Sequence, residues 1–533
     1  MNNSDLIVSI LKKAGVKNGF GIPSGNVLPL MEAMRTGGIN FVLTAHEGSA
    51  GFAADVSGRL TGIPGLCIAT LGPGATNLAT GVGNAWLDRS PLIAITCNLR
   101  TEQLGRRIQM FIDHHALFAP ITKASLALRN NSVEETLMEA IEITTTEPFG
   151  PVHLDLPEDV ALAPAQTPSL QFKPSFSLAS AETDKIQKAI QLLNTAKRPI
   201  IVLGSNAMRV PDPRIFVDLI ERHQIPFATT TMAKGLVNEN HKLAIGCIER
   251  ACRQHQRKLL NSSDLIIGIG YDTIEVEYEV WIGDTPLLQI DIENVDINEG
   301  VHLAHEVIGD LVTSVKTIIE SPKISNSWKQ NELIKHKNEF NQLLRPLGTE
   351  FSAHEAIDAV REGMPEDGIL SFDVGAHTHQ IASQWITSAS KQFLITNGWS
   401  SMGFGLPAAI AAKLVFPEKD VVCLIGDGCF QMTCGEVATA KRLGINLPIV
   451  VLDDRWLGLI RVKQLRRQYG IYGTELQVEN YKQPPEHYFG VPALGVETAE
   501  SLTDAIKMAL KAHGPTVIEA LINSDHYIET VFD

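Results

Sequence analysis

The stretch of residues 421–464 constrains the fold of this chain most, because it alternates strand-like and helix-like segments. Two apolar runs, residues 421–425 and 448–452, predict buried strands. Between them, residues 431–443 have the pattern of a helix, and Gly444 is a typical stop signal. The order strand, helix, strand predicts two neighbouring strands of a parallel sheet.

A carboxylate stands at the end of each predicted strand. Asp427 lies in Gly426-Asp427-Gly428 after the first, and Asp453-Asp454 follow the second. Ligands bind where the ends of parallel strands meet. Carboxylates and backbone carbonyls suit Mg²⁺, which takes its other ligands from water or a phosphate, and a helix N-terminus accepts that phosphate. The stretch therefore predicts a magnesium–diphosphate site, although a lone Gly-Asp-Gly also occurs as a plain turn.

The spacing of the two carboxylates sharpens this prediction. Asp454 follows Asp427 after 27 positions, and the stretch resembles the thiamine-diphosphate motif of the acetolactate synthase and pyruvate decarboxylase family. The resemblance implies that the metal ligands are Asp427, Asp454 and the backbone carbonyl of Trp456. Most of the family has an Asn-Asn pair where this chain has Asp453-Asp454. The catabolic acetolactate synthases also have Asp at the ligand position; the alternative is a degenerate site that has lost its metal.

The resemblance covers essentially the whole chain and implies the rest of the cofactor site. Glu47 matches the glutamate that hydrogen-bonds the aminopyrimidine ring, although it could be an ordinary helix-start residue. Met402 matches the apolar residue that props the cofactor into its bent form, although core packing would also explain it. The implied cofactor-binding residues are Glu47, Gly375, His377, Ser401, Met402, Gly426, Asp427, Gly428, Cys429, Asp454, Trp456, Leu457 and Gly458.

The substrate side of the site is less sharply defined. The resemblance implies substrate contacts at Ser24, Gly25, Gln109 and Ile460, and catalytic roles for Glu47, Gln109, His114 and His115. Gln109 stands four positions before Asp113, whereas acetolactate synthases have the glutamine three positions before the aspartate. The histidine pair resembles that of pyruvate decarboxylases, and histidine can transfer protons near neutral pH. Either histidine could instead be a plain helix-start residue.

The domain organisation is predicted to be three doubly wound α/β domains with parallel sheets. A chain of 533 residues is too long for one hydrophobic core. We expect a pyrimidine-binding domain at 1–162, a central α/β domain at 183–320 and a diphosphate- and Mg-binding domain at 349–533. A segment rich in Pro and Ser, residues 163–182, and a hydrophilic segment, residues 320–348, are the expected linkers.

Composition excludes several classes of function. The net charge of −15 argues against a nucleic-acid partner, which needs a basic surface. No apolar stretch approaches 18 residues, and the N-terminal residues lack the pattern of a signal peptide. The seven cysteines form no short-range pattern. These features predict a cytoplasmic protein with no membrane association.

The middle segment bears on flavin, which some members of the family bind. Those relatives have an Arg soon after the segment that corresponds to Gly268-Ile269-Gly270, where this chain has Tyr271-Asp272. We therefore expect FAD to be absent. In the family the cofactor lies between two chains, so the resemblance implies at least a homodimer, and a homotetramer is favoured.

Together these features predict a thiamine-diphosphate- and Mg-dependent enzyme that acts on a small 2-oxo acid. The first choice is decarboxylation followed by carboligation of the enamine to an acceptor, as in acetolactate synthases. The second is a non-oxidative decarboxylase that releases an aldehyde. The third is a cofactor-binding regulatory protein with weakened catalysis.

Overall fold

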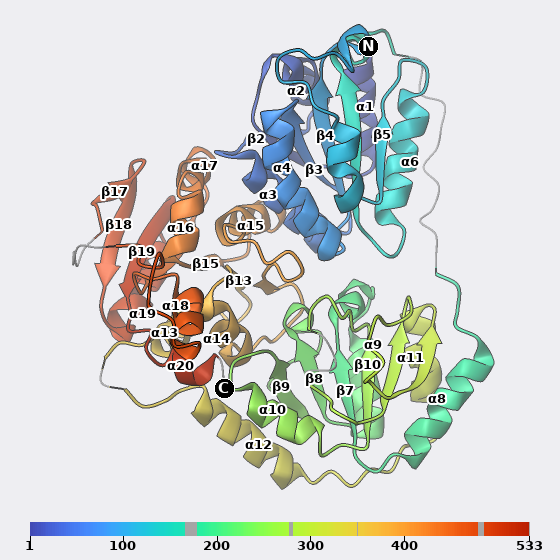
Figure 1. Ribbon diagram of the computed structural model, residues 1–533, viewed down its shortest axis with the longest axis vertical. Coiled ribbons are helices and arrows are strands. Elements are labelled where there is room, and N and C mark those ends of the chain that lie inside the picture. The colour runs from blue at the N-terminus through green and yellow to red at the C-terminus, as the bar shows by residue number, and fades with distance from the viewer. Residues whose placement is uncertain (166–177, 277–280, 349, 478–483, 532–533) are drawn as a thin grey trace.

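The computed structural model describes residues 1–165, 178–276, 281–348, 350–477 and 484–531. Within these ranges the strands form three mainly parallel sheets, each covered by helices on both faces. In Figure 1 the N-terminal unit lies at the top, the middle unit at the lower right and the C-terminal unit at the left. The predicted fold class, three doubly wound α/β units, is confirmed.

The N-terminal sheet has the strand order β2-β1-β3-β4-β6-β5, and every pair in it is parallel. Its strands are β1 (Asn18–Gly21), β2 (Asn40–Leu43), β3 (Gly65–Thr70), β4 (Leu92–Asn98), β5 (Ala124–Ala127) and β6 (Pro151–Pro157). The helices around it are α1 (Asn3–Lys13), η1 (Gly25–Val27), α2 (Leu28–Gly37), α3 (Glu47–Thr61), α4 (Pro73–Leu87), η2 (Thr101–Gln103), α5 (His114–Phe118), η3 (Ala119–Ile121), α6 (Val133–Thr145) and α7 (Glu158–Leu162).

The middle sheet has the strand order β12-β11-β10-β7-β8-β9 and is also parallel. Its strands are β7 (Pro199–Leu203), β8 (Phe227–Thr230), β9 (Ala244–Ile248), β10 (Leu265–Ile269), β11 (Leu287–Asp291) and β12 (Leu303–Ile308). The helices of this part are α8 (Thr183–Thr195), η4 (Ser205–Arg209), α9 (Arg214–His223), η5 (Thr231–Ala233), α10 (Arg253–Leu260), α11 (Leu311–Glu320) and α12 (Gln330–Leu343).

The C-terminal sheet has the strand order β14-β13-β15-β16-β19-β18-β17, and only the β17–β18 pair among these is antiparallel. Its strands are β13 (Ile369–Phe372), β14 (Phe393–Leu394), β15 (Val421–Gly426), β16 (Leu447–Asp453), β17 (His487–Tyr488), β18 (Val491–Val496) and β19 (Pro515–Leu521). Its helices are α13 (Ala353–Gly363), α14 (Ala376–Gln384), α15 (Gly405–Val415), α16 (Asp427–Thr433), α17 (Glu436–Arg442), α18 (Gly458–Arg466), α19 (Ala499–Ala509) and α20 (Tyr527–Thr530).

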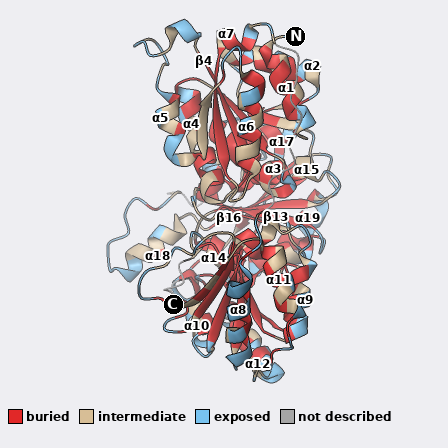
Figure 2. Ribbon diagram, turned by 90° about the vertical axis from the view of Figure 1, so that its right-hand side faces the viewer, coloured by how far each residue is buried: buried red, intermediate tan, exposed pale blue. Residues whose placement is uncertain are grey.

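Apolar, β-branched runs form the central strands, because a strand covered by helices on both faces must be apolar along its whole length. Every residue of β4, β7, β10, β15 and β16 is buried. Figure 2 shows the strands as a buried interior and the exposed residues mainly on the outer helices. The predicted strands at 421–425 and 448–452 are thus confirmed as β15 and β16.

The structure corrects two details of the sequence prediction. The helix expected at 431–443 is two helices, α16 and α17, with Cys434 and Gly435 between them. The hydrophilic segment at 320–348 is more than a linker, because it contains α12, whose Leu333 and Phe340 are buried. A helix with a mainly polar surface is easily mistaken for a linker in sequence. Most of the other expected linker, residues 166–177, lies outside the described residues.

The N-terminal and C-terminal units meet along α3 and α4. The helices α3 and α4 cross with their backbones almost touching, since a Cβ at Gly81 would lie 2.5 Å from the Cα of Gly51. Buried Asp88, at the end of α4, accepts backbone N–H groups of Asn397 and Gly398, and Arg59 bridges Asp88 and the carbonyl of Ile395. These bonds fix the position of α3 against the C-terminal unit.

No helix among the described residues is both long and apolar enough to cross a membrane.

Candidate functional site

The two predicted metal-binding carboxylates lie at the ends of adjacent strands. The pairing of β15 with β16 in parallel brings Gly426 opposite Leu452, so Asp427 and Asp453 follow at the same edge of the sheet. Asp427 accepts the backbone N–H of Gly428 at 2.7 Å and that of Arg455 at 3.0 Å. Arg455 also donates this N–H to Asp453, at 3.1 Å. One backbone donor therefore holds two carboxylates together.

This cluster carries more negative charge than its surroundings can easily accommodate. Burial, followed by repulsion from Asp454 and Asp453, raises the pKa of Asp427 to about 9. Burial also raises the pKa of Asp454 to about 6. Charged carboxylates become unfavourable in this way when they share a site removed from water. A divalent cation among them would remove both the repulsion and the loss of hydration, so the cluster fits a metal such as Mg²⁺.

A cavity of about 230 Å³ opens beside the carboxylates. It is walled by the ends of β13, β15 and β16 and by the first residues of α14, α16 and α18. The predicted site residues that line it are Gly375, His377, Met402, Gly426, Asp427, Gly428, Cys429, Asp454, Trp456, Leu457, Gly458 and Ile460. Ser401 is not among the lining residues, although its neighbour Ser400 is. The structure thus gathers residues from 374 to 527 around one space.

The cavity has features that suit a diphosphate. The side chain of His377 is buried, and its Nε2 has no hydrogen-bond partner among the described residues. Gly375 and Gly426 press against this ring, since a Cβ at either would lie within 3 Å of its Cε1. The cavity also meets the N-termini of α14 and α18, where backbone N–H groups favour an anion. An unpaired ring nitrogen and these helix ends would bind diphosphate oxygens while the carboxylates hold the cation.

Glu47 lies in the N-terminal unit, at the first residue of α3. Its carboxylate is buried and accepts the side-chain amide of Asn77 at 3.0 Å. The backbone just before it is fixed by the C-terminal unit, because Glu436 accepts the N–H groups of Ala45 and His46. Glu47 does not line the cavity that contains Asp427. The two predicted parts of the cofactor site are therefore not assembled around that cavity in the single chain.

The predicted substrate residues lie on loops. Ser24 precedes η1, and its hydroxyl is shielded from solvent without a partner among the described residues. Gly25 and Gln109 are exposed, and Ile460 on α18 is 42% exposed. Of these four, only Ile460 lines the cavity beside Asp427.

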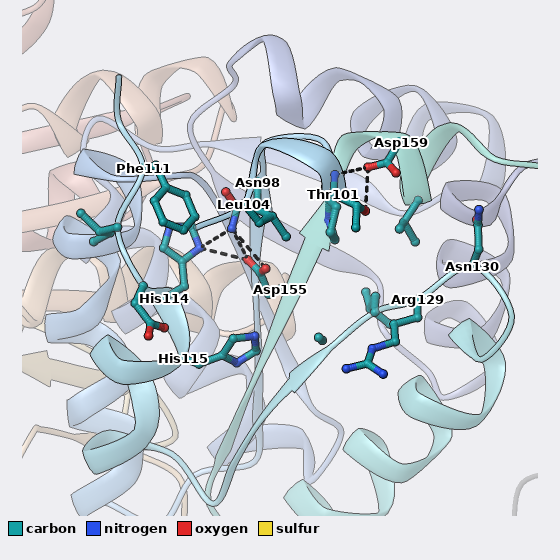
Figure 3. Close-up of a pocket in the computed structure, with 16 residues that line it drawn as sticks. Asn98, Thr101, Leu104, Phe111, His114, His115, Arg129, Asn130, Asp155 and Asp159 are labelled. Carbon is teal, nitrogen blue, oxygen red and sulfur yellow. Dashed lines mark hydrogen bonds and ion pairs between the residues drawn. The ribbon is translucent and has the colours of Figure 1, made fainter. Parts of the chain in front are cut away.

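His114 and His115 line a second cavity, of about 720 Å³, at the ends of β4, β5 and β6 (Figure 3). His114 is buried, and both of its ring nitrogens have partners, Gly72 on one side and Asp155 on the other. His115 is less buried, and its Nδ1 lies 2.7 Å from the hydroxyl of Ser125. Neither histidine lines the cavity beside Asp427.

Sequence reasoning missed two residues that shape the cofactor cavity. Asp373 has no role predicted from the sequence, yet its buried carboxylate accepts the backbone N–H groups of Gly403 and Gly405 and so positions the segment that carries Met402. Its position directly after the apolar run Ile369–Phe372, like that of Asp427 after its strand, was the available signal. Tyr527 also lines the cavity, and no local pattern marks it.

Tyr271 and Asp272, which by resemblance stand where flavin-binding relatives have an arginine, lie in the middle unit. Asp272 forms an ion pair with Arg89, which also pairs with Glu293. The neighbouring turns are packed closely, since a Cβ at Gly204 would lie 2.3 Å from the Cα of Tyr271. Asp272 therefore joins the middle unit to the N-terminal unit.

Comparison with known proteins agrees with this geometry. Residues 1–117, 186–318 and 373–520 match, respectively, the N-terminal TPP binding domain, the central domain and the C-terminal TPP binding domain of thiamine pyrophosphate enzymes. The chain is also similar over nearly its full length to curated acetolactate synthases.

Three of these relatives illustrate the similarity. The probable acetolactate synthase large subunit of Methanococcus aeolicus is 29% identical, over 100% of this chain and 94% of the relative. The acetolactate synthase large subunit of Lactococcus lactis is 28% identical, over 99% and 93%. The acetolactate synthase of Bacillus subtilis is 27% identical, over 99% and 95%. The chain therefore belongs to the thiamine pyrophosphate enzymes, with thiamine diphosphate as cofactor and Mg²⁺ as the usual metal, and it is similar to acetolactate synthases.

Proposed function

We propose that the protein decarboxylates a 2-oxo acid and joins the remaining acyl group to a second oxo compound. The observation that carries this proposal is the cavity beside Asp427, which combines a cation site with the unpaired nitrogen of buried His377. The names of the relatives support carboligation as the outcome. When bound, thiamine diphosphate would stabilise the carbanion that loss of CO₂ leaves behind.

The chain's own residues would have distinct roles around that cofactor. Asp427, Asp454 and the carbonyl of Trp456 would hold Mg²⁺, and Met402 would pack against the cofactor. Glu47 would share a proton with the aminopyrimidine ring, a role that suits a buried carboxylate. The residues proposed to face the substrate are Ser24, Gly25, Gln109 and Ile460. The proposed domains span residues 1–162, 183–320 and 349–533.

The complete site is proposed to form between two chains. Glu47 does not line the cavity that contains Asp427, so a second copy would have to supply it. Exposed apolar side chains follow Ile460 along the chain, which is typical of a surface that a partner covers. They are Leu465, Tyr469, Ile471 and Tyr472, the last 88% exposed. A homodimer is the smallest assembly that this proposal allows, and a homotetramer is the expected one.

The function is tested by the products formed from pyruvate, alone and with a second 2-oxo acid present. We expect an acetohydroxy acid as the main product, identified by mass spectrometry. Acetaldehyde as the sole product would favour the alternative, a decarboxylase that releases an aldehyde. Absence of turnover across a panel of 2-oxo acids, in protein that binds the cofactor, would favour the regulatory alternative.

The cation site is tested with Asp427→Ala. Loss of this carboxylate should weaken Mg-dependent binding of thiamine diphosphate by at least roughly 100-fold, because a ligand to the ion is lost. Isothermal titration calorimetry with and without EDTA measures this effect. Asp504→Ala on the exposed face of α19 removes the same charge and is the matched control. Equal affinities of the two variants would contradict the assignment.

The shared site is tested by complementation between two inactive variants. Glu47→Gln and Asp427→Ala should each abolish turnover alone. Co-expressed, they should regain about one quarter of the wild-type activity, since half of the dimers are hybrids and each hybrid has one intact site of two. Separately tagged chains allow the hybrid to be isolated. A purified hybrid without activity would show that both residues serve one chain.

Flavin is not expected as a cofactor, because Tyr271-Asp272 stands where flavin-binding relatives have an arginine, and Asp272 is paired with Arg89. After the purified protein is denatured, the supernatant should therefore show no absorption band of free flavin. Stoichiometric flavin in that supernatant would overturn this expectation.

A further inference from the structure

The turn before α4 is held by a histidine whose two ring nitrogens are both committed. Gly72 donates its backbone N–H to Nε2 of His114 at 3.2 Å, and this hydrogen bond is buried. Gly72 has a φ of +59°, and a Cβ there would lie 2.3 Å from the carbonyl oxygen of Met110. The turn is therefore tightly constrained on one side by the loop before His114 and on the other by His114 itself.

The direction of this hydrogen bond fixes the tautomer of His114. A backbone N–H can only donate, so Nε2 must carry a lone pair. The proton of the neutral ring is then on Nδ1, which lies 3.0 Å from a carboxylate oxygen of Asp155. Asn98 donates to both oxygens of that carboxylate, at 2.9 and 3.1 Å. His114 thus has neither a free proton to give nor a free lone pair to accept one.

The same tautomer explains why these side chains do not form a metal site. His114, His153 and Asp155 offer ligand atoms within 4.8 Å of one another and are all buried. A metal would need the lone pair of Nδ1 on His114, where the proton stands. Burial also lowers the pKa of His153 to about 3, against the pull of Asp155, so its ring is neutral too. The cluster is a hydrogen-bonded support and not an ion cage.

Further hydrogen bonds connect His114 to His115, and both histidines line the cavity in Figure 3. The hydroxyl of Thr96 lies 2.9 Å from Nδ1 of His114 and 2.7 Å from Nε2 of His153. Ser125 then bridges His153 and His115, at 2.7 Å to each. If the Nδ1 proton of His114 is shared between Asp155 and Thr96, each later group can donate to the next, from Thr96 through His153 and Ser125 to His115. The path begins at the N–H of Gly72. Because that N–H cannot be released, this chain of bonds holds the turn but cannot carry a proton to it.

The turn before α4 leads into the residues that contact the carboxylate of Glu47. Asn77, in the first turns of α4, donates to the carboxylate of Glu47 at 3.0 Å. A Cβ at Gly74 would lie 3.4 Å from the other oxygen of that carboxylate. Movement of the turn would therefore displace the groups that orient Glu47.

We propose that His114 is a positioning residue that holds the turn of residues 72–77, and through Asn77 the carboxylate of Glu47, by accepting the N–H of Gly72. Its effect on turnover rests on the proposed function, in which Glu47 acts on the cofactor. Its effect on the turn does not, because the hydrogen bond from Gly72 exists in the chain by itself.

The test compares two amides at this position. His114→Gln carries an amide oxygen at about the reach of Nε2 and can still accept from Gly72. His114→Asn carries its amide at the reach of Nδ1 and can still bond Asp155 but not Gly72. In the cofactor-free protein, amide hydrogen exchange of residues 71–77 should be roughly fivefold to tenfold faster in His114→Asn, the scale of one lost hydrogen bond, and close to wild type in His114→Gln. The kcat for 2-oxo acid turnover should fall by roughly one to two orders of magnitude in His114→Asn, with a smaller change in KM, and within about twofold in His114→Gln.

The outcomes separate the possible roles of His114. If the imidazole transfers a proton to or from substrate, both variants should lose activity equally, since neither amide titrates near neutral pH, and the proposal is overturned. Equal exchange rates in the two variants would also overturn it. If wild-type protein has no turnover with any 2-oxo acid, the proposed function fails, and hydrogen exchange alone still decides whether His114 holds the turn.

Discussion

The proposed cofactor site depends on three carboxylates that lie at one edge of the C-terminal sheet. Asp427, Asp453 and Asp454 lie together because β15 and β16 are parallel neighbours. Burial and mutual repulsion raise the pKa of Asp427, so the cluster costs folding free energy unless a cation compensates it. A fold keeps such a cluster for binding and not for stability. The rest of the C-terminal unit serves to hold it, with backbone N–H groups of Gly428 and Arg455 as donors.

The N-terminal unit handles its single important carboxylate differently. Glu47 is held by a neutral amide, Asn77, and forms no ion pair with any of the described residues. The support behind it, from Gly72 to His114, is also neutral apart from Asp155. One unit thus concentrates charge where a cation is proposed to bind, and the other avoids charge around a group that is proposed to share a proton.

Contacts between the N-terminal and C-terminal units help to position the predicted site residues of both units. Glu436 of α17 fixes the backbone at Ala45 and His46, immediately before Glu47. The Arg59–Asp88 pair ties α3 and α4 to the segment that leads to Met402. These contacts are polar and buried, so they are directional as well as cohesive. They fix the position of each half of the site within one chain, and the proposed dimer would bring complementary halves together.

The sequence by itself determined the α/β class, most central strands and the carboxylates that end β15 and β16, because these depend on local hydrophobic runs and on the order of elements along the chain. By resemblance it also predicted cofactor contacts for Glu47 and His377. Only the tertiary structure decided that Tyr527 and Asp373 shape the cofactor cavity, that α12 occupies an expected linker, and that Glu47 does not line that cavity. The roles of the two nitrogens of His114 were also beyond sequence, because they are set by Gly72 and Asp155, which lie 42 positions before it and 41 after it. Local patterns specify strands and their ends, whereas the partner of a buried polar group is chosen by packing between distant segments.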